Sequence, residues 1–116
     1  MVARPRKRYV PERGDIIWID FSPHRGHEQA ARRAAVALSP AKYNKSSGLV
    51  VVCPITSKRK GYPFEVEVVA EKTQGVALAD HVQSFDWRER HSVFIEALNH
   101  GALRQIQKRV IALIEQ

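Results

Sequence analysis

The apolar run LVVVCPI at residues 49–55 constrains the fold of this 116-residue chain most, because it must be buried somewhere. With Thr56 it forms the clearest strand signal in the sequence, since it is rich in β-branched residues. The run is far shorter than the roughly 20 apolar residues that a membrane-spanning helix requires. We therefore expect a core strand, and a chain of this length can bury one core without cross-links.

Other segments also have the composition of strands. Bulky β-forming residues, short apolar runs, or an alternation of apolar and acidic residues predict strands at residues 16–21, 34–39, 64–69 and 76–79. Residues 84–95 have strand signals near both ends but no clear boundary. Residues 40–48 are predicted to be a loop with room for a helical turn. The chain is thus predicted to be mainly β up to this point.

The C-terminal segment follows a helical period. Its apolar residues recur at steps of three and four, at Leu103, Ile106, Val110, Leu113 and Ile114. Asn99 is a suitable N-cap for this helix. We expect a small β-barrel, open or closed, with one helix packed on it. The domain is predicted to span residues 14–116, after a flexible basic segment at 1–13.

The net charge of +7 favours a polyanion or an acidic protein as partner, although four of the positive charges fall within residues 1–8. The single cysteine, Cys53, cannot form an internal disulfide and is interpreted as a small buried apolar residue. The N-terminus has no apolar stretch of the kind that signal peptides contain. We expect a cytoplasmic protein without a membrane partner.

The sequence predicts neither a metal nor a cofactor. Its five histidines are not joined by a cysteine pair or a carboxylate cluster, and His24 and His27 fall in a loop rather than on a helix. No glycine-rich phosphate loop or nucleophile elbow is present.

Three polar groups stand at the ends of expected strands: HEQAARR before residue 34, ITSKRKGYP around residue 56 and ADHVQSFDW after residue 79. In a small barrel they can converge on one rim. Each group also fits a plainer interpretation as solvated charge or an exposed turn, in which an ion pair of Glu28 with an arginine contributes under about 1 kcal/mol.

The chemistry of these groups is complementary. Arg32 or Arg33 offers a planar fork to two phosphate oxygens, and the Thr56 hydroxyl can donate a further hydrogen bond. Glu28 can orient the arginine or accept a proton. Cations for neighbouring phosphates and rings for stacking on unpaired bases are available at Lys58, Arg59, Lys60, Tyr62 and Trp87.

Four blocks carry a resemblance to a known family. They are GDIIWIDFSP at residues 14–23, GHEQAARRAAVALSP at 26–40, KGYPFEV at 60–66 and GVALADHVQS at 75–84. The chain resembles the MazF/PemK family of toxin endoribonucleases nearly without gaps from Arg8 to Ser84. The resemblance implies an SH3-like barrel, shared with the CcdB-type toxins, that forms a homodimer with an RNA groove across it.

The resemblance also implies an activity. It implies sequence-specific, metal-independent cleavage of single-stranded RNA by the substrate's own 2′-hydroxyl, which leaves a 2′,3′-cyclic phosphate and a 5′-hydroxyl and inhibits translation and growth. It further implies a cognate acidic, MazE-like antitoxin whose extended tail fills the groove.

Site residues follow from the matched motifs. The resemblance implies catalytic roles for Arg33, Thr56 and Glu28. It implies RNA contacts at Gln29, Arg32, Ser57, Lys58, Arg59, Lys60, Tyr62, His81 and Gln83. His81 stands where relatives often have Gln, which leaves the preferred RNA sequence open.

The chain departs from the family pattern beside the arginine. The family often has Gly-x-Arg-Pro where this chain has Ala31-Arg32-Arg33-Ala34. The spacing to LSP selects Arg33 as the catalytic residue. Because neighbours on a strand face opposite sides, we expect only one of the two arginines to serve.

Two other functions remain open at this stage. A gyrase-directed toxin of similar fold relies on a Trp-Gly-Ile ending, whereas this chain ends IALIEQ. A non-catalytic RNA-binding barrel would bind RNA with strong salt dependence and leave it intact. Incubation with naked RNA distinguishes both from a ribonuclease.

Overall fold

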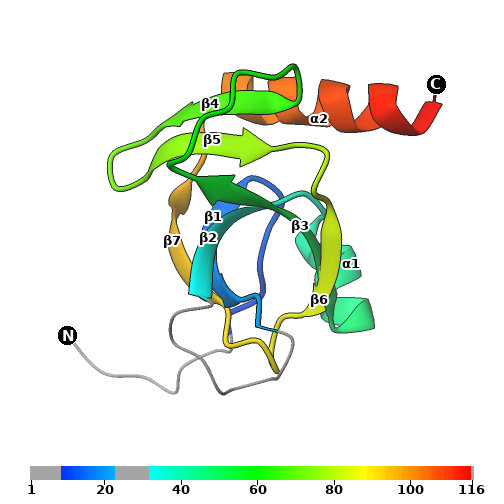
Figure 1. Ribbon diagram of the computed structural model, residues 1–116. Coiled ribbons are helices and arrows are strands. Elements are labelled where there is room, and N and C mark those ends of the chain that lie inside the picture. The colour runs from blue at the N-terminus through cyan, green and yellow to red at the C-terminus, as the bar shows by residue number, and fades with distance from the viewer. Residues whose placement is uncertain (1–8, 23–31, 116) are drawn as a thin grey trace.

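A computed structural model describes residues 9–22 and 32–115 of the chain (Figure 1). The predicted positions Glu28 and Gln29 lie outside these residues. The described elements are β1 (Asp15–Asp20), β2 (Arg32–Ala37), α1 (Ala41–Ser47), β3 (Leu49–Thr56), β4 (Glu65–Val69), β5 (Gln74–Leu78), β6 (Gln83–Asp86), β7 (Val93–Ala97) and α2 (His100–Glu115).

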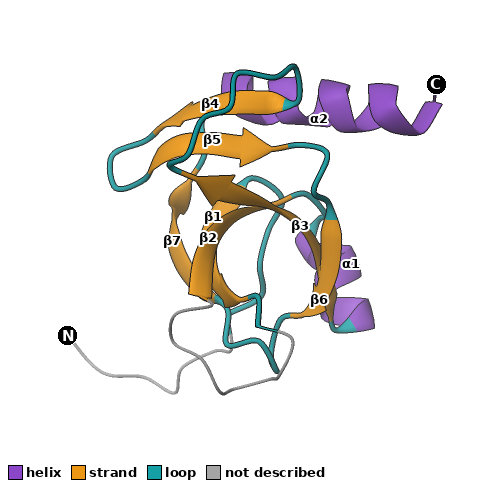
Figure 2. Cartoon of the chain, viewed as in Figure 1, coloured by secondary structure: helices purple, strands orange, loops and turns teal. Residues whose placement is uncertain are grey.

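One curved antiparallel sheet forms the body of the molecule (Figure 2). Its strand order is β4-β5-β3-β2-β1-β7, and β6 pairs separately with β3. The first half of β3 pairs with β6 at residues 49–52, and its end pairs with β5 at residues 55–56. This change of partner curls the sheet on itself. The prediction of a small, mainly β barrel with a C-terminal helix is therefore confirmed.

Side chains that alternate along the strands form two cores. Ile16 on β1 belongs to a cluster with Val36, Cys53 and the α2 residues Leu103 and Ile106. Its neighbour Ile17 points to the other face of the sheet and joins a second cluster. That second cluster contains Ile17, Ile19, Ala35, Ala37, Val50, Val52 and Trp87. Complete burial of each large side chain stabilises the fold by about 1.5–3 kcal/mol.

The helix α2 covers the first cluster and packs along β4 (Figure 1). Asn99 caps it as predicted, because its Oδ1 accepts a hydrogen bond of 2.8 Å from the Ala102 N–H. Leu103 and Ile106 are buried, whereas Ile114 near the end of the helix is exposed. In the part of the chain that the structure describes, no helix combines the length and apolar content that a membrane span needs.

A buried asparagine organises the region around α1, which is a seven-residue helix where a loop with room for one helical turn was predicted. The Asn44 side chain donates to the Pro11 and Ser39 carbonyl oxygens at 2.8 and 2.9 Å and accepts from the Ser39 hydroxyl at 2.6 Å. Gly48 ends the helix in a left-handed conformation, at φ 78°.

The hypothesis that Trp87 stacks on RNA bases is wrong. Its side chain is only 2% exposed, and its indole N–H donates to the Asn44 carbonyl oxygen at 2.8 Å. A buried indole needs such a partner, so this residue belongs to the core. The interpretation of Cys53 as a buried apolar residue is confirmed, and burial raises the pKa of its thiol to about 12.

Strand boundaries differ from the predictions mainly at β2. It begins at Arg32, two residues before the predicted start, because Arg32 and Arg33 continue the pairing with β1 opposite Asp20 and Ile19. The ambiguous region at residues 84–95 contains β6, a turn and β7. Both arginines are therefore held on a strand rather than on a loop.

We predict that Asn44→Ala lowers the free energy of unfolding by about 2–3 kcal/mol, since buried carbonyl and hydroxyl groups lose their partners. Urea unfolding followed by circular dichroism at fixed protein concentration measures the change. Lys45→Ala, an exposed position on the same helix, is the matched control and should change stability little. Equal stability of the two variants would contradict the role given to Asn44.

Candidate functional site

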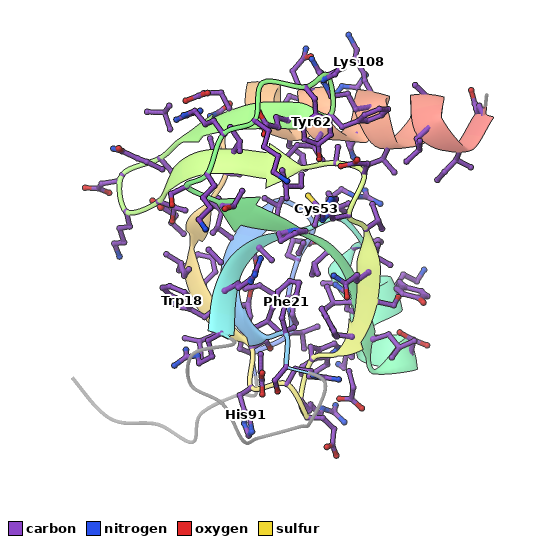
Figure 3. The ribbon with its side chains drawn as sticks, viewed as in Figure 1. Trp18, Phe21, Cys53, Tyr62, His91 and Lys108 are labelled. Atoms are coloured by element: carbon purple, nitrogen blue, oxygen red, sulfur yellow. The ribbon has the colours of Figure 1, made fainter. Side chains whose placement is uncertain are left out.

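An open pocket of about 630 Å³ lies where β1, β2 and β7 meet the end of β3 and the start of β5. Figure 3 labels Trp18 at the left of the view, beside β2 and β7. The lining residues are Trp18, Arg32, Arg33, Ala34, Ile55, Thr56, Ser57, Lys58, Lys72, Thr73, Gln74 and Ile95.

The lining of the pocket divides into apolar residues, which we call its floor, and charged residues, which we call its rim. The floor consists of Trp18, Ala34, Ile55 and Ile95, and the charged groups are Arg32, Arg33, Lys58 and Lys72. No carboxylate is among the described residues that line it. Unbalanced positive charge over a partly apolar surface attracts anions and strengthens their hydrogen bonds. The pocket therefore suits a phosphate group attached to an apolar or aromatic moiety.

The two arginines leave β2 on opposite faces, as predicted. The Arg32 guanidinium lies 5.6 Å from the centre of the Trp18 ring, and that of Arg33 lies 5.9 Å from the centre of the Phe21 ring. Both nevertheless line the pocket, because they stand at the first two positions of the strand. Although their side chains point to opposite faces of the sheet, both arginines therefore belong to the site.

Thr56 reaches the same pocket from the neighbouring strand β3. The last β2–β3 pair is Ala35 with Pro54, and continuing that register places Arg33 opposite Thr56. The Thr56 hydroxyl oxygen accepts a hydrogen bond of 3.1 Å from the Lys58 N–H. Accepting this bond leaves the hydroxyl proton available to donate to a bound anion.

The backbone around Thr56 depends on Gly75 of β5. A Cβ atom at Gly75 would lie 2.5 Å from the Thr56 carbonyl oxygen, which no real contact permits. Its φ of +153° also disfavours other residues. Gly75 thus fixes how closely β5 approaches Thr56.

Besides the apolar residues Ala34, Ile55 and Ile95, four pocket residues were not predicted as site residues: Trp18, Lys72, Thr73 and Gln74. Trp18 is hidden within a strand pattern that otherwise predicts burial. The other three belong to the turn and strand start between β4 and β5, which come near β2 only after the sheet has curled. A lysine beside two hydrogen-bonding residues is too common a pattern to mark a site.

The remaining described residues of the predicted site lie outside the pocket, on the loop before β4, the turn after β5 and the start of β6. We call them the second polar group: Arg59, Lys60, Tyr62, His81 and Gln83. The Tyr62 hydroxyl donates to Asp80 Oδ1 at 2.8 Å, and His81 Nε2 lies 3.8 Å from the same oxygen. Arg59 pairs with Glu67 at 2.5 Å. The Lys60 N–H donates to the Glu65 carboxylate at 2.7 Å.

Exposure of this second group varies. Lys60 and His81 are exposed, as is Gln83 at the start of β6, while Tyr62 is half-buried. The pKa of Tyr62 is raised to about 12, mainly by the hydrogen bond to Asp80 and next by desolvation. The phenol is therefore a stable hydrogen-bond donor at neutral pH.

Comparison with known proteins gives one answer. Residues 12–114 match the family described as PemK-like, MazF-like toxin of type II toxin-antitoxin system. The chain is 45% identical over 107 residues to the endoribonuclease toxin MazF of Escherichia coli strain K12, covering 92% of this chain and 96% of that protein. It is 30% identical over 110 residues to the endoribonuclease toxin ChpB of the same strain, covering 90% and 94%.

Solved structures agree with this match. The crystal structure of MazF from Deinococcus radiodurans superposes with a TM-score of 0.85 at 43% identity, covering 94% of this chain and all of that one. A MazE-MazF crystal structure from the same organism gives a TM-score of 0.83 at 38% identity, covering 94% and 99%. The chain belongs to the PemK-like, MazF-like family of type II toxin–antitoxin toxins.

We predict that Tyr62 stays protonated at pH 10.5 in the folded protein. Its stabilising hydrogen bond to Asp80 is fully present below the ordinary phenol pKa of about 10 and is lost only as the pH rises through about 12. The absorbance of phenolate at 295 nm should therefore match between the native protein and Tyr62→Phe at pH 10.5.

Two comparisons make this titration decisive. In urea the same two proteins should differ by the absorbance of one tyrosine. In the folded Asp80→Asn variant, Tyr62 should ionise closer to its ordinary pKa. An extra ionised tyrosine in the native protein at pH 10.5, with circular dichroism unchanged, would contradict the assignment.

Proposed function

We propose that this chain is a toxin endoribonuclease that cleaves single-stranded RNA in the pocket between β2 and β3. The observation that carries the proposal is that Arg33 and Thr56, from neighbouring strands, line the same pocket. The described lining of this pocket holds four cations and no acid. Family membership supplies the reaction class, because its relatives are named endoribonucleases.

Cleavage proceeds by internal transfer. The 2′-hydroxyl oxygen of one nucleotide attacks the adjacent phosphorus, a 2′,3′-cyclic phosphate forms, and the bond from phosphorus to the 5′-oxygen breaks. The 2′-hydroxyl loses its proton, and the departing 5′-oxygen gains one. Negative charge builds up on the two non-bridging oxygens in the transition state.

Arg33 and Thr56 stabilise that charge. A guanidinium presents two N–H groups in the plane of two phosphate oxygens, and the Thr56 hydroxyl adds a third donor. Both are held on strands, so little reorganisation is needed when the charge develops. By analogy with oxyanion holes, one such donor is worth about 3–4 kcal/mol of the barrier.

Proton transfer requires a group beyond the described lining. Arginine remains protonated at any working pH and is a poor base. The two proposed candidates are Glu28, a carboxylate that orients Arg33 or accepts the proton, and His81. Such assistance is worth about 10²–10⁴-fold. Because the rim supplies its own positive charge, the reaction is proposed to need no metal ion and no cofactor.

RNA contacts extend beyond the pocket. Arg32, Ser57 and Lys58 hold phosphates next to the scissile one, and Gln29 contributes from the segment that precedes β2. The second polar group, with Arg59, Lys60, Tyr62, His81 and Gln83, contacts bases and phosphates further along the strand. These contacts supply the preference for a short RNA sequence.

The partners follow from charge and from the relatives. MazE-MazF complexes are known for Deinococcus radiodurans. An acidic, MazE-like antitoxin is proposed for this chain, with its carboxylates occupying the cationic pocket in place of phosphates. The active form is proposed to be a homodimer in the cytoplasm, where it cleaves messenger RNA and arrests translation.

We predict that the purified protein, freed from any inhibitor, cleaves an unstructured RNA equally with and without a chelator. Arg33→Ala should lower the single-turnover rate by about 100- to 1000-fold, since the main stabilising cation is lost. End-group analysis should detect 2′,3′-cyclic phosphates and 5′-hydroxyls. Circular dichroism and gel filtration confirm that the variant keeps its fold and oligomeric state.

Arg32→Ala is the matched control. It removes a cation from the same pocket and the same strand, and we expect a smaller loss of rate. A larger loss than in Arg33→Ala would assign catalysis to Arg32 instead. Intact RNA with the wild-type protein would defeat the ribonuclease assignment, and loss of cleavage with the chelator would defeat the metal-free mechanism.

We also predict that Gly75→Ala slows cleavage by about 10- to 100-fold, because the added Cβ pushes on the Thr56 carbonyl and displaces the hydroxyl. The single-turnover rate of the folded variant measures this. Gly48→Ala is the control, since Gly48 also has a positive φ, of +78°, but lies outside the pocket and has no atom within 4 Å of the added Cβ. Full activity of Gly75→Ala would show that the contact does not position Thr56.

A further inference from the structure

One aromatic side chain in the pocket is exposed although its neighbours on the same face of the strand are buried. Trp18 shares a face of β1 with Ile16, which is fully buried, and with Asp20, which is 3% exposed. Trp18 itself is 41% exposed and lines the floor of the pocket. The other tryptophan of the chain, Trp87, is 2% exposed. A large aromatic ring left open in a concave site points to a ligand that covers it.

The ring is held in place by its neighbours. The Arg32 guanidinium lies 5.6 Å from the centre of the Trp18 ring, within the range of a cation–π contact. The Arg32 Nε atom is buried and has no hydrogen-bond partner among the described residues. The contact of the guanidinium with the ring, rather than a hydrogen bond at Nε, is therefore the interaction through which Arg32 positions Trp18. Strand pairing opposite Ala34 and Val93 fixes the backbone of Trp18 on both sides.

The surroundings define what the ring can bind. Ala34, Ile55 and Ile95 continue the apolar floor, while Arg33, Thr56 and Lys58 stand on the rim. A ligand that fits both must carry an anionic group next to a flat, weakly polar one. A nucleotide of single-stranded RNA has this composition, and its base stacks on aromatic side chains irrespective of its sequence.

We propose that Trp18 is the stacking platform for a nucleobase next to the scissile phosphate, with Arg32 as the residue that positions the ring. The inference rests on the proposed function and adds a binding residue to it. Stacking keeps the phosphodiester seated between Arg33 and Thr56 without adding sequence preference. Sequence preference is then left to the second polar group.

Fluorescence tests the platform directly, because Trp18 is exposed and Trp87 is buried. The probe is an RNA oligonucleotide with 2′-O-methyl riboses throughout, which binds but cannot be cleaved. Its binding should quench the emission of the wild-type protein, and the quenching should be absent in Trp18→Phe. Trp18→Ala should raise the Kd for this probe by about 5- to 100-fold, with a smaller rise for Trp18→Phe.

Two controls separate stacking from general damage. Val69→Ala truncates another exposed apolar side chain, 64% exposed on β4 and outside the pocket, and should leave the Kd unchanged. Probes with one abasic position are compared in turn. At the nucleotide that stacks, removal of the base should weaken binding to the wild type but add little to the effect of Trp18→Ala. Additive losses at every position would overturn the proposal.

The outcomes also separate this inference from the proposed function. If unmodified RNA is cleaved but the emission is not quenched and Trp18→Phe and Trp18→Ala bind within twofold of the wild type, the platform is refuted and the ribonuclease stands. If RNA stays intact but the quenching and the Trp18 effect are present, the platform stands as an RNA-binding element and the ribonuclease fails. Intact RNA without quenching refutes both.

Discussion

The change of pairing partner along β3 is the constraint on which the site depends. Residues 49–52 pair with β6, residues 55–56 pair with β5, and β2 pairs along the other edge at residues 52–54. Pro54, which has no N–H to donate, lies at the break between β6 and β5. From β3, the strands β5 and β6 run in different directions, so the sheet is curved around it (Figure 2). The end of β3 is turned so that Thr56 reaches the pocket beside Arg33 and the start of β5.

The same curvature concentrates positive charge. Arg32 and Arg33 come from β2, Lys58 from the loop after β3 and Lys72 from the turn before β5, yet all four line one pocket. Like charges at this proximity oppose folding, and the two arginines offset part of that cost by contacts with the Trp18 and Phe21 rings. The unbalanced charge makes an anionic ligand bind more strongly than it would at a neutral surface. An acidic antitoxin and an RNA phosphate would compete for the same uncompensated positive charge in the pocket.

The sequence was sufficient for the parts of this fold that depend on local pattern. The run at residues 49–56 predicted β3 to the residue, the period of the C-terminal segment predicted α2, and Asn99 predicted its cap. The resemblance placed Arg33 and Thr56 in one site, and both line the pocket. The catalytic role of each remains a prediction, as does that of Glu28, which lies outside the described residues.

What the sequence missed depends on contacts between distant segments. Trp87 has the same composition signal whether it stacks on RNA or fills a core. Its burial in the second cluster and its hydrogen bond to the Asn44 carbonyl oxygen place it in the core. Lys72 and Gln74 enter the pocket because β5 pairs with the far end of β3 rather than with β6. Gly75 resembles any loop glycine until its closeness to the Thr56 carbonyl is known. The role of each of these residues can be inferred only when its tertiary contacts are known.

The pocket and the second polar group are joined by one short loop, so a single RNA strand can reach both. Thr56 belongs to the pocket, and Tyr62, six residues further along, belongs to the second group with Asp80 and His81. Hydrogen bonds from the Lys60 and Gly61 N–H groups to the Glu65 carboxylate hold the loop between them. In the proposed mode of binding, RNA that places its phosphate at Thr56 and follows this loop would present its next bases to Tyr62 and His81. The pocket, whose rim is cationic and whose floor is apolar, would then contact features common to every nucleotide. The second group offers directional donors and acceptors, which differ in fit from base to base. In that division, the pocket supplies rate and affinity for any RNA sequence, and the second group supplies the choice of sequence.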